Sequence, residues 1–588
     1  MDISVIATIL TIVAGVIAIY SLFFGQKPLV EVLSKLVKRK KNSKANRSNE
    51  LIDVGEAGSK KENMSASSTI ATIDRGTEYF NSAVEEVINL VSSSQYVQAQ
   101  RNAAKLRDEI VRISDQTRLD IRLLLGELDV WYAHATMYVG ETEKALNILK
   151  DIVQVFSDEE GKYKDGVSFT RWCNVLGRAY NHIGYINWIN LGHYEIALQM
   201  FREAIKVLSK GSLEKELATA LDNLGRVYAH LGYETRSELL ISHGLRLRKS
   251  DTYRYALSLN SIAISSTNFG KPERASLVIE DAYQIFKQNI SRFGERGVGL
   301  ALLTKGQSLR YLGSQDYPRP WKEKLDILTE AVKILKEAES IFRNVGEEIR
   351  LFQATNELGC VFRERATLFK QNDEMENALR SSTDARNRLE ESISLAKGIG
   401  TGYKYRIYFV DACEDLARLH FNMADYSESK KWIANGQKAI LPEYKFVGKP
   451  RSRNILPSEC YDDFWQQLGK INLLIGEILY VNYQTVGKKS NFGNLEEAIE
   501  HYLLSAAYYG RYSERPLAVE NKDYYPQYRP QLATHQQFIA KWYELISSLE
   551  VDHLLDIKSK ILPNLVKRLD LETSWLSDLV VDPIDCLL

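Results

Sequence analysis

The residue types that carry out chemistry occur in this chain, but not at the spacings that chemistry requires. Cysteines stand at positions 173, 360, 413, 460 and 586, and none forms the Cys-x-x-Cys pair typical of zinc and redox sites. The chain has no Gly-x-x-x-x-Gly-Lys-Ser/Thr phosphate loop, no His-Glu-x-x-His motif and no Gly-x-Ser-x-Gly motif. Its nine histidines are scattered, without a nucleophile, base and orienting group in one pattern. We therefore predict no enzyme activity, no metal site and no cofactor.

The charge balance and the cysteines limit the class of partner and the compartment. Lys plus Arg equals Asp plus Glu at 76 each, so there is no excess positive charge with which to bind nucleic acid. Cys173, Cys360 and Cys413 lie within helical patterns, and we expect them to be buried small apolar residues. Unpaired cysteines of this kind suit a reducing compartment.

The elements that position the polar side chains are best seen in the stretch from Leu221 to Leu247. Its spacing predicts two helices joined at Gly232, because glycine leaves a helix without a Cβ penalty. Ser237, Ile241 and Gly244 follow at spacings of four and three, which places them on one face of the second helix. Small residues at 225, 237 and 244 allow the two helices to approach closely.

The same spacing recurs along the chain. Leu176-Gly177-Arg178-Ala179-Tyr180 nearly duplicates Leu224-Gly225-Arg226-Val227-Tyr228. The pattern resembles the tetratricopeptide repeat (TPR), a 34-residue helical hairpin. About eight such hairpins fit between Leu119 and Tyr509; unrelated amphipathic helices are the alternative.

The resemblance implies an all-α fold built around an α-solenoid of about eight TPR-like hairpins. Within it, we predict N-terminal capping helices over residues 75–118 and the solenoid over 119–509. Residues 510–588 would form an insertion followed by a C-terminal helical cap. The insertion is rich in tyrosine and arginine, the types common in binding hot spots; packing of the insertion as a cap is the alternative.

In the family that the repeats resemble, first helices line a concave groove that holds a peptide or a helix of a protein partner. The resemblance implies a polar binding stripe in that groove, formed by Asn174, Arg178, Asn181, Asn223, Arg226 and His230. Some family members clamp a C-terminal carboxylate there. Asp222, Glu414 and Asp415 stand where that clamp needs basic or amide groups, so we do not predict it here. The alternative is that the stripe only solvates the groove.

The N-terminus carries a second pattern. Residues 3–24 contain no charged side chain, and 22 residues are enough to cross a hydrocarbon core of about 30 Å. We predict a transmembrane anchor over residues 1–26; a cleaved signal peptide is the alternative. The basic residues after the run place that flank in the cytoplasm, with the N-terminus outside. The predicted localisation is therefore a single-pass membrane protein with a cytoplasmic solenoid.

Two segments would connect the anchor to the repeats. Residues 27–41 show an apolar stripe beside basic side chains, which favours an amphipathic helix at an anionic lipid surface. Its membrane-interface residues would be Lys35, Lys38, Arg39, Lys40 and Lys41. An extension of the anchor that docks on protein is the alternative. Residues 42–74 are rich in Ser, Asn, Lys, Glu and Gly, and predict a disordered linker.

Two functions are compatible with these patterns. The first is a membrane-tethered adaptor whose solenoid groove binds a cytosolic protein, with lipid bound through the anchor. The second is a regulated membrane effector, in which the repeats sense a partner or protease and the N-terminal helix acts on the membrane. Neither the partner nor the oligomeric state follows from the sequence.

Overall fold

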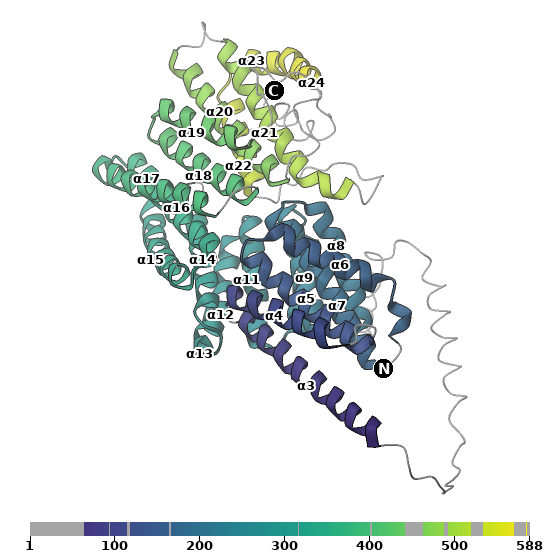
Figure 1. Cartoon of the computed structure of the whole chain (residues 1–588). Coiled ribbons are helices and arrows are strands. Elements are labelled where there is room, and N and C mark those ends of the chain that lie inside the picture. The colour runs from purple at the N-terminus through teal and green to yellow at the C-terminus, as the bar shows by residue number, and fades with distance from the viewer. Residues whose placement is uncertain are drawn as a thin grey trace, which may run out of the picture. The chain divides into compact units, whose positions relative to one another are not determined.

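The computed structural model describes residues 64–92, 95–114, 118–163, 166–315, 317–399, 403–440, 462–486, 492–518, 533–569 and 584. The chain divides into two units, Met1–Ile73 and Asp74–Leu588. In the first unit, only the start of helix α3 (Met64–Ser92) is described. The second unit is helical throughout its described residues (Figure 1).

Eight pairs of helices in the described residues pack as antiparallel hairpins. The pairs are α5 (Leu119–Tyr138) with α6 (Thr142–Ser157), α7 (Gly166–Tyr185) with α8 (Tyr194–Lys210), α9 (Glu214–His230) with α10 (Glu234–Leu247), α11 (Thr252–Asn268) with α12 (Pro272–Gln288), α14 (Arg296–Leu312) with α15 (Trp321–Val345), α16 (Glu348–Gln371) with α17 (Met375–Gly398), α18 (Tyr403–Asn422) with α19 (Tyr426–Ile440), and α20 (Asp462–Val486) with α21 (Phe492–Ala518). Part of α3 and α4 (Tyr96–Ile113) precede them. α22 (Ala533–Ser547), α23 (Val551–Asp556), the π-helix η3 (Ile557–Ile561) and α24 (Leu562–Leu569) follow.

Three short elements lie between these helices. They are η1 (Glu160–Lys162), the π-helix η2 (Ile186–Asn190) that continues α7, and α13 (Ile290–Phe293). The π-helix widens the last turn of α7, and its side chains become part of the candidate site below.

The close approach within a hairpin follows from glycine. Gly232 adopts a φ of 82° between α9 and α10, as predicted for the turn. A Cβ built on Gly225 would lie 2.6 Å from Ile241 Cγ1 and 3.1 Å from the Ser237 carbonyl oxygen. The predicted register of α9 against α10 is therefore confirmed.

First helices form the inner layer of the stack. Each one, from α5 through α20, contacts the next first helix directly. Second helices are instead connected by long side chains, such as the Arg343–Glu391 ion pair of 3.2 Å between α15 and α17. In a curved stack the inner layer has the shorter spacing, so the first helices line the concave side.

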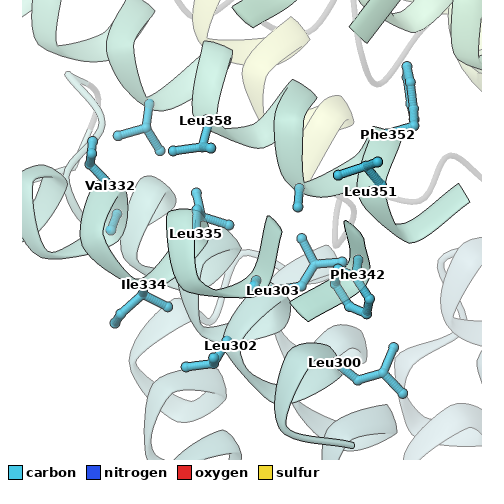
Figure 2. Packing of buried hydrophobic residues seen from close by; sticks show 14 of the residues in the cluster. Leu300, Leu302, Leu303, Val332, Ile334, Leu335, Phe342, Leu351, Phe352 and Leu358 are labelled. Carbon is cyan, nitrogen blue, oxygen red and sulfur yellow. The ribbon is translucent and has the colours of Figure 1, made fainter. Parts of the chain in front are cut away.

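The core of the hairpins is divided into several clusters of buried hydrophobic side chains. Figure 2 shows part of one cluster, in which buried leucines of α14 occur together with Val332, Leu335 and Phe342 of α15 and Leu358 of α16. A second cluster joins distant hairpins, because Trp188 and Leu224 share it with Leu468 and Ile471 of α20. α8 also packs against α21. The second unit therefore bends back so that its early and late repeats are in contact.

The predicted transmembrane helix is corrected by this fold. Among the described residues, no helix combines the length and the apolar character needed to cross a bilayer. The predictions of a fold preceded by a transmembrane helix and of a single-pass membrane localisation are therefore wrong on this finding, and the all-helical solenoid is what stands. The anchor predicted over residues 1–26, and with it the run 3–24, lies outside the described residues.

The predicted juxtamembrane helix 27–41 also lies outside the described residues, together with Lys35, Lys38, Arg39, Lys40 and Lys41. Two predicted boundaries shift. α3 begins at Met64, so the last part of the predicted linker 42–74 is helical, because it extends a helix whose later turns bury Phe80, Val84 and Val87. Similarly, α21 continues to Ala518, into the predicted insertion.

Candidate functional site in the inner helical layer

Two arginines occupy equivalent places on neighbouring first helices. Arg178 on α7 lies with its guanidinium carbon 4.7 Å from the ring centre of Trp131 on α5. Arg226 on α9 lies 4.7 Å from the ring centre of Trp188 on η2. Both are cation–π contacts, which hold a guanidinium flat against an indole face. The π-helix η2 thus places Trp188 against Arg226 of α9.

The two arginines differ in their polar partners. Arg178 donates from Nε to Asn174 Oδ1 at 2.7 Å and from Nη2 to Glu216 Oε1 at 2.7 Å. Arg226 makes no hydrogen bond or ion pair with any described residue, and its Nε is buried without an acceptor. An unsatisfied buried donor is costly, and among the predicted stripe residues Arg226 is one whose hydrogen-bonding capacity the described residues leave unused.

The remaining residues of the predicted stripe have structural contacts. Asn223 Nδ2 donates to Asn181 Oδ1 at 3.1 Å, and both side chains are buried. This bond joins α7 to α9. The His230 ring lies edge-on to Trp188, with 5.7 Å between ring centres. The six predicted residues therefore lie on two adjacent first helices, where two hydrogen bonds, Arg178 to Asn174 and Asn223 to Asn181, are internal to the set.

A pair of histidines lies beside Arg178. His134 Nδ1 and His182 Nε2 are 3.3 Å apart, and His182 Nδ1 is buried without a partner. Burial, and then the charge of Arg178, lowers the pKa of His134 to about 4. Burial and the neighbouring His134 lower the pKa of His182 well below its usual value. Both rings are therefore neutral at pH 7.

Tyrosines at the inner surface were missed by the sequence analysis. Tyr138 at the end of α5 is 38% exposed, yet desolvation raises its pKa well above the usual range. Tyr185 and Tyr96 both add to this shift. The sequence signal was available, because tyrosine stands near the C-terminal ends of α5 and α7 alike.

The acidic residues that argued against a carboxylate clamp belong to the packing of the solenoid. Arg248 Nη1 donates to Asp222 Oδ2 at 2.5 Å, and Ser258 Oγ donates to the same oxygen at 2.7 Å. Arg363 Nη1 donates to Asp415 Oδ1 at 2.6 Å. These carboxylates are buried between hairpins and are already bonded.

No described residues gather three or more histidine, cysteine or acidic side chains in a group that could hold a metal ion. Cys173, Cys360 and Cys413 are buried, as predicted. Burial raises the pKa of Cys173 to about 11 and that of Cys413 to about 12, so these thiols are protonated at neutral pH and unreactive.

The fold and the site together define a helical-repeat binding protein, in which an inner layer of first helices presents cations and aromatic rings. A family model described as the tetratricopeptide repeat matches residues 177–207, from the middle of α7 into α8. The tetratricopeptide-repeat resemblance seen in the sequence is thus confirmed over these residues.

Among curated proteins, the outer dynein arm-docking complex subunit 4 of Homo sapiens is 33% identical over 93 residues, which are 16% of this chain and 12% of that protein. Solved structures with a similar fold include a Rap protein complexed with competence and sporulation factor, at 15% identity and a TM-score of 0.38, covering 62% of this chain and 98% of that one. The apo quorum sensor NprR from B. thuringiensis has 15% identity and a TM-score of 0.43, covering 73% and 98%.

The human IFIT1 dimer with m7Gppp-AAAA has 14% identity and a TM-score of 0.38, covering 82% of this chain and 84% of that one. Similarities this distant concern the helical fold alone, and we draw no partner from them. Repeat solenoids of this class are typically non-enzymatic modules for interaction.

Proposed function

We propose that this chain is an interaction scaffold that binds a protein partner, as an extended peptide or a helix, along the inner layer of first helices. The single observation that carries the proposal is the state of Arg226. It is a cation held flat on Trp188 beside His230, with a buried donor and no acceptor in the described residues. Arginine and aromatic side chains of this kind dominate binding hot spots.

The surroundings of Arg226 favour a partner that lies across several repeats. Trp131 and Tyr138 lie on the first helix α5, and Trp188 lies on η2, which continues α7. These rings offer apolar contact, while the guanidinium groups of Arg178 and Arg226 offer donors. A peptide backbone needs such donors along its length, whereas a compact small molecule would use one pocket.

A site-specific photocrosslinking experiment tests this proposal. A benzophenone amino acid would replace Tyr138, which is 38% exposed on the inner layer. In a matched control, it would replace Leu277, which is 75% exposed on the second helix α12. We expect a discrete protein adduct at position 138 that is absent at position 277, in the full chain expressed in its own cell.

The adduct at position 138 should be mapped to one segment of the crosslinked protein by mass spectrometry. A synthetic peptide of that segment should then compete with crosslinking. Adducts that are the same at both positions, or that occur only at 277, would contradict binding along the inner layer.

A further inference from the structure

A cleft lies between the second helices α15 and α17, which both pack on α16 (Figure 1). Its volume is about 330 Å³, at the lower end of the range of about 300–1,000 Å³ that holds small ligands. The cleft is lined by side chains from all three helices, namely Lys336, Phe362, Asp384, Asn387, Arg388 and Glu391. None of these residues belongs to the candidate site of the inner layer.

Two of the lining residues are already neutralised by a ring of ion pairs. Arg388 Nη1 lies 3.1 Å from Glu339 Oε1 of α15 and 2.9 Å from Glu391 Oε2. Arg343 Nη2 of α15 lies 3.0 Å from Glu339 Oε1 and 3.2 Å from Glu391 Oε1. Each guanidinium group therefore shares two carboxylates, and the ring is neutral without a ligand. Because residue numbers increase together along the two sides of the ring, α15 and α17 run in the same direction here.

One helical turn earlier, the same two faces carry a lysine and an aspartate. Lys336 stands three residues before Glu339, and Asp384 stands four residues before Arg388. At these spacings each residue shares a helix face with its counterpart in the ring. Yet neither Lys336 nor Asp384 makes an ion pair or a hydrogen bond with any residue that the structure describes. The cleft is therefore lined by two opposite charges that the protein does not pair.

Two further lining residues add to this pair of charges. Asn387, on the same helix as Asp384, makes no hydrogen bond within the described part of the chain, and its amide can both donate and accept. Phe362 of α16 is 7% exposed and belongs to the core, so it offers the cleft an apolar surface in a fixed position. The lining charges are two positive and two negative. A ligand that carries both charges matches this lining, whereas an anion or a cation alone would leave one of the unpaired groups unsatisfied.

From this arrangement we infer a binding site for a small zwitterion, a free amino acid with an apolar side chain, in the cleft between α15 and α17. Its ammonium group would donate to the Asp384 carboxylate. Its carboxylate would accept from the Lys336 ammonium group and the Asn387 amide, and its side chain would pack on Phe362. Charge-assisted hydrogen bonds of this kind are stronger than those between neutral groups. The inference goes beyond the proposed function, because it concerns a small molecule and a cleft between second helices.

Isothermal titration calorimetry of the full chain tests the site, with L-phenylalanine as the probe. Two analogues each lack one of its charges, since phenylpropionate has no ammonium group and phenylethylamine has no carboxylate. We expect saturable binding of L-phenylalanine and about tenfold weaker binding of each analogue, which corresponds to the loss of one charged hydrogen-bonding contact. Absence of saturable binding of L-phenylalanine at millimolar concentration would overturn the site.

Two substitutions assign each charge of the ligand to its partner. K336Q should weaken binding of L-phenylalanine about tenfold and leave phenylethylamine unchanged, because that analogue has no carboxylate for Lys336 to bind. D384N should weaken L-phenylalanine to a similar extent and leave phenylpropionate unchanged. The matched control is K333Q, which removes an exposed lysine of α15 that does not line the cleft. It should bind all three probes as the wild type does.

Circular dichroism would establish that each variant is folded, as we expect for side chains that pair with no described residue. Binding of L-phenylalanine that is unchanged in both K336Q and D384N would overturn the assignment to this cleft. The assignment would also be overturned if K333Q weakened binding as much as K336Q does, or if K336Q weakened all three probes equally.

Discussion

At the scale of single residues, the absence of a side chain matters as much as the presence of one. Gly225 lies in the middle of α9, where glycine lowers helix stability, yet a Cβ there would overlap Ile241. Gly177, Gly306 and Gly359 have the same relation to leucines of their partner helices. The position sets how closely the two helices of a hairpin approach.

Replacing Gly225 by alanine should therefore destabilise the fold. The new Cβ would lie only 2.6 Å from Ile241 Cγ1, so the two helices would have to move apart. Overpacking of this kind costs about 1–3 kcal/mol. Urea unfolding followed by circular dichroism measures the change. The control is Gly436→Ala on α19, whose new Cβ would be 3.5 Å from its nearest neighbour. It should be neutral or stabilising; equal destabilisation by both changes would contradict the register.

Stability should also fall as the pH is lowered from 7 to 5. The pKa of His134 and of His230 is lowered to about 4 in the folded chain, against about 6.5 when unfolded. The unfolded state therefore binds more protons in this window, so stability present above pH 6.5 is lost toward pH 4.

The expected loss is about 2 kcal/mol for each histidine at pH 5. His134→Gln should lose less stability than the wild type between pH 7 and pH 5, as measured by urea midpoints at both pH values. Burial raises the pKa of Asp222 and of Glu414, so the contribution of these two carboxyl groups to stability increases as the pH falls, opposite to that of the histidines. The comparison with the variant is what isolates the histidine, and an identical pH dependence would rule out its role.

At the scale of elements, buried polar networks connect one hairpin to the next. Asp222 on α9 accepts from Arg248, which follows α10, and from Ser258 on α11. The side chains of Arg248 and Asp222 are only 4% and 7% exposed. The network fits beneath Gly244, where a Cβ would lie 2.5 Å from Asp222 Oδ1.

Asp222→Ala should cost about 3–5 kcal/mol, because it leaves the Arg248 charge buried without a counter-ion. Thermal or urea unfolding measures this. Arg274→Ala is the control, since its ion pair with Glu238 is largely exposed and should contribute no more than about 0.5 kcal/mol. Comparable losses in the two variants would show that burial of the Asp222 network has been overestimated.

Much of this element-level arrangement was predictable. The spacing of Gly225, Gly232 and Ile241 sufficed to place two helices and their contact face, since helical geometry is local. The Trp188 contact was not predictable, because a π-helix lengthens α7 and shifts the residues that follow. The partners of Asp222 and Asp415 also escaped prediction, since they come from the next hairpin and depend on how far each repeat is rotated. The N-terminal pattern added a transmembrane helix to the predicted fold, and that part was wrong, because no described helix is long and apolar enough to cross a bilayer.

At the scale of the second unit, the contact between α8 and α21 adds coupling that a linear repeat array lacks. In an open array each repeat interacts only with its neighbours. Here Ile471 on α20 is buried in one cluster with Trp188 and Leu198, more than 250 residues earlier in the chain.

Ile471→Ala should therefore cost about 2–5 kcal/mol and raise amide hydrogen exchange in α8 as well as in α20. Hydrogen exchange with mass spectrometry resolves the two helices. Leu149→Ala, in the separate cluster around α6, is the control and should leave α20 unchanged. Faster exchange confined to α20 in the Ile471 variant would contradict coupling between early and late repeats.

The contact of α8 with α21 has a consequence for binding. A partner held along the inner layer, across several first helices, would contact hairpins that belong to the same closed path of packing. Closure and ligand binding are then linked equilibria, and linkage is reciprocal. If binding of the partner raises the equilibrium constant for forming the α8–α21 contact by some factor, then formation of that contact raises the affinity for the partner by the same factor. A substitution in the α8–α21 contact would therefore weaken binding of the partner by the factor by which the bound partner protects that contact from opening.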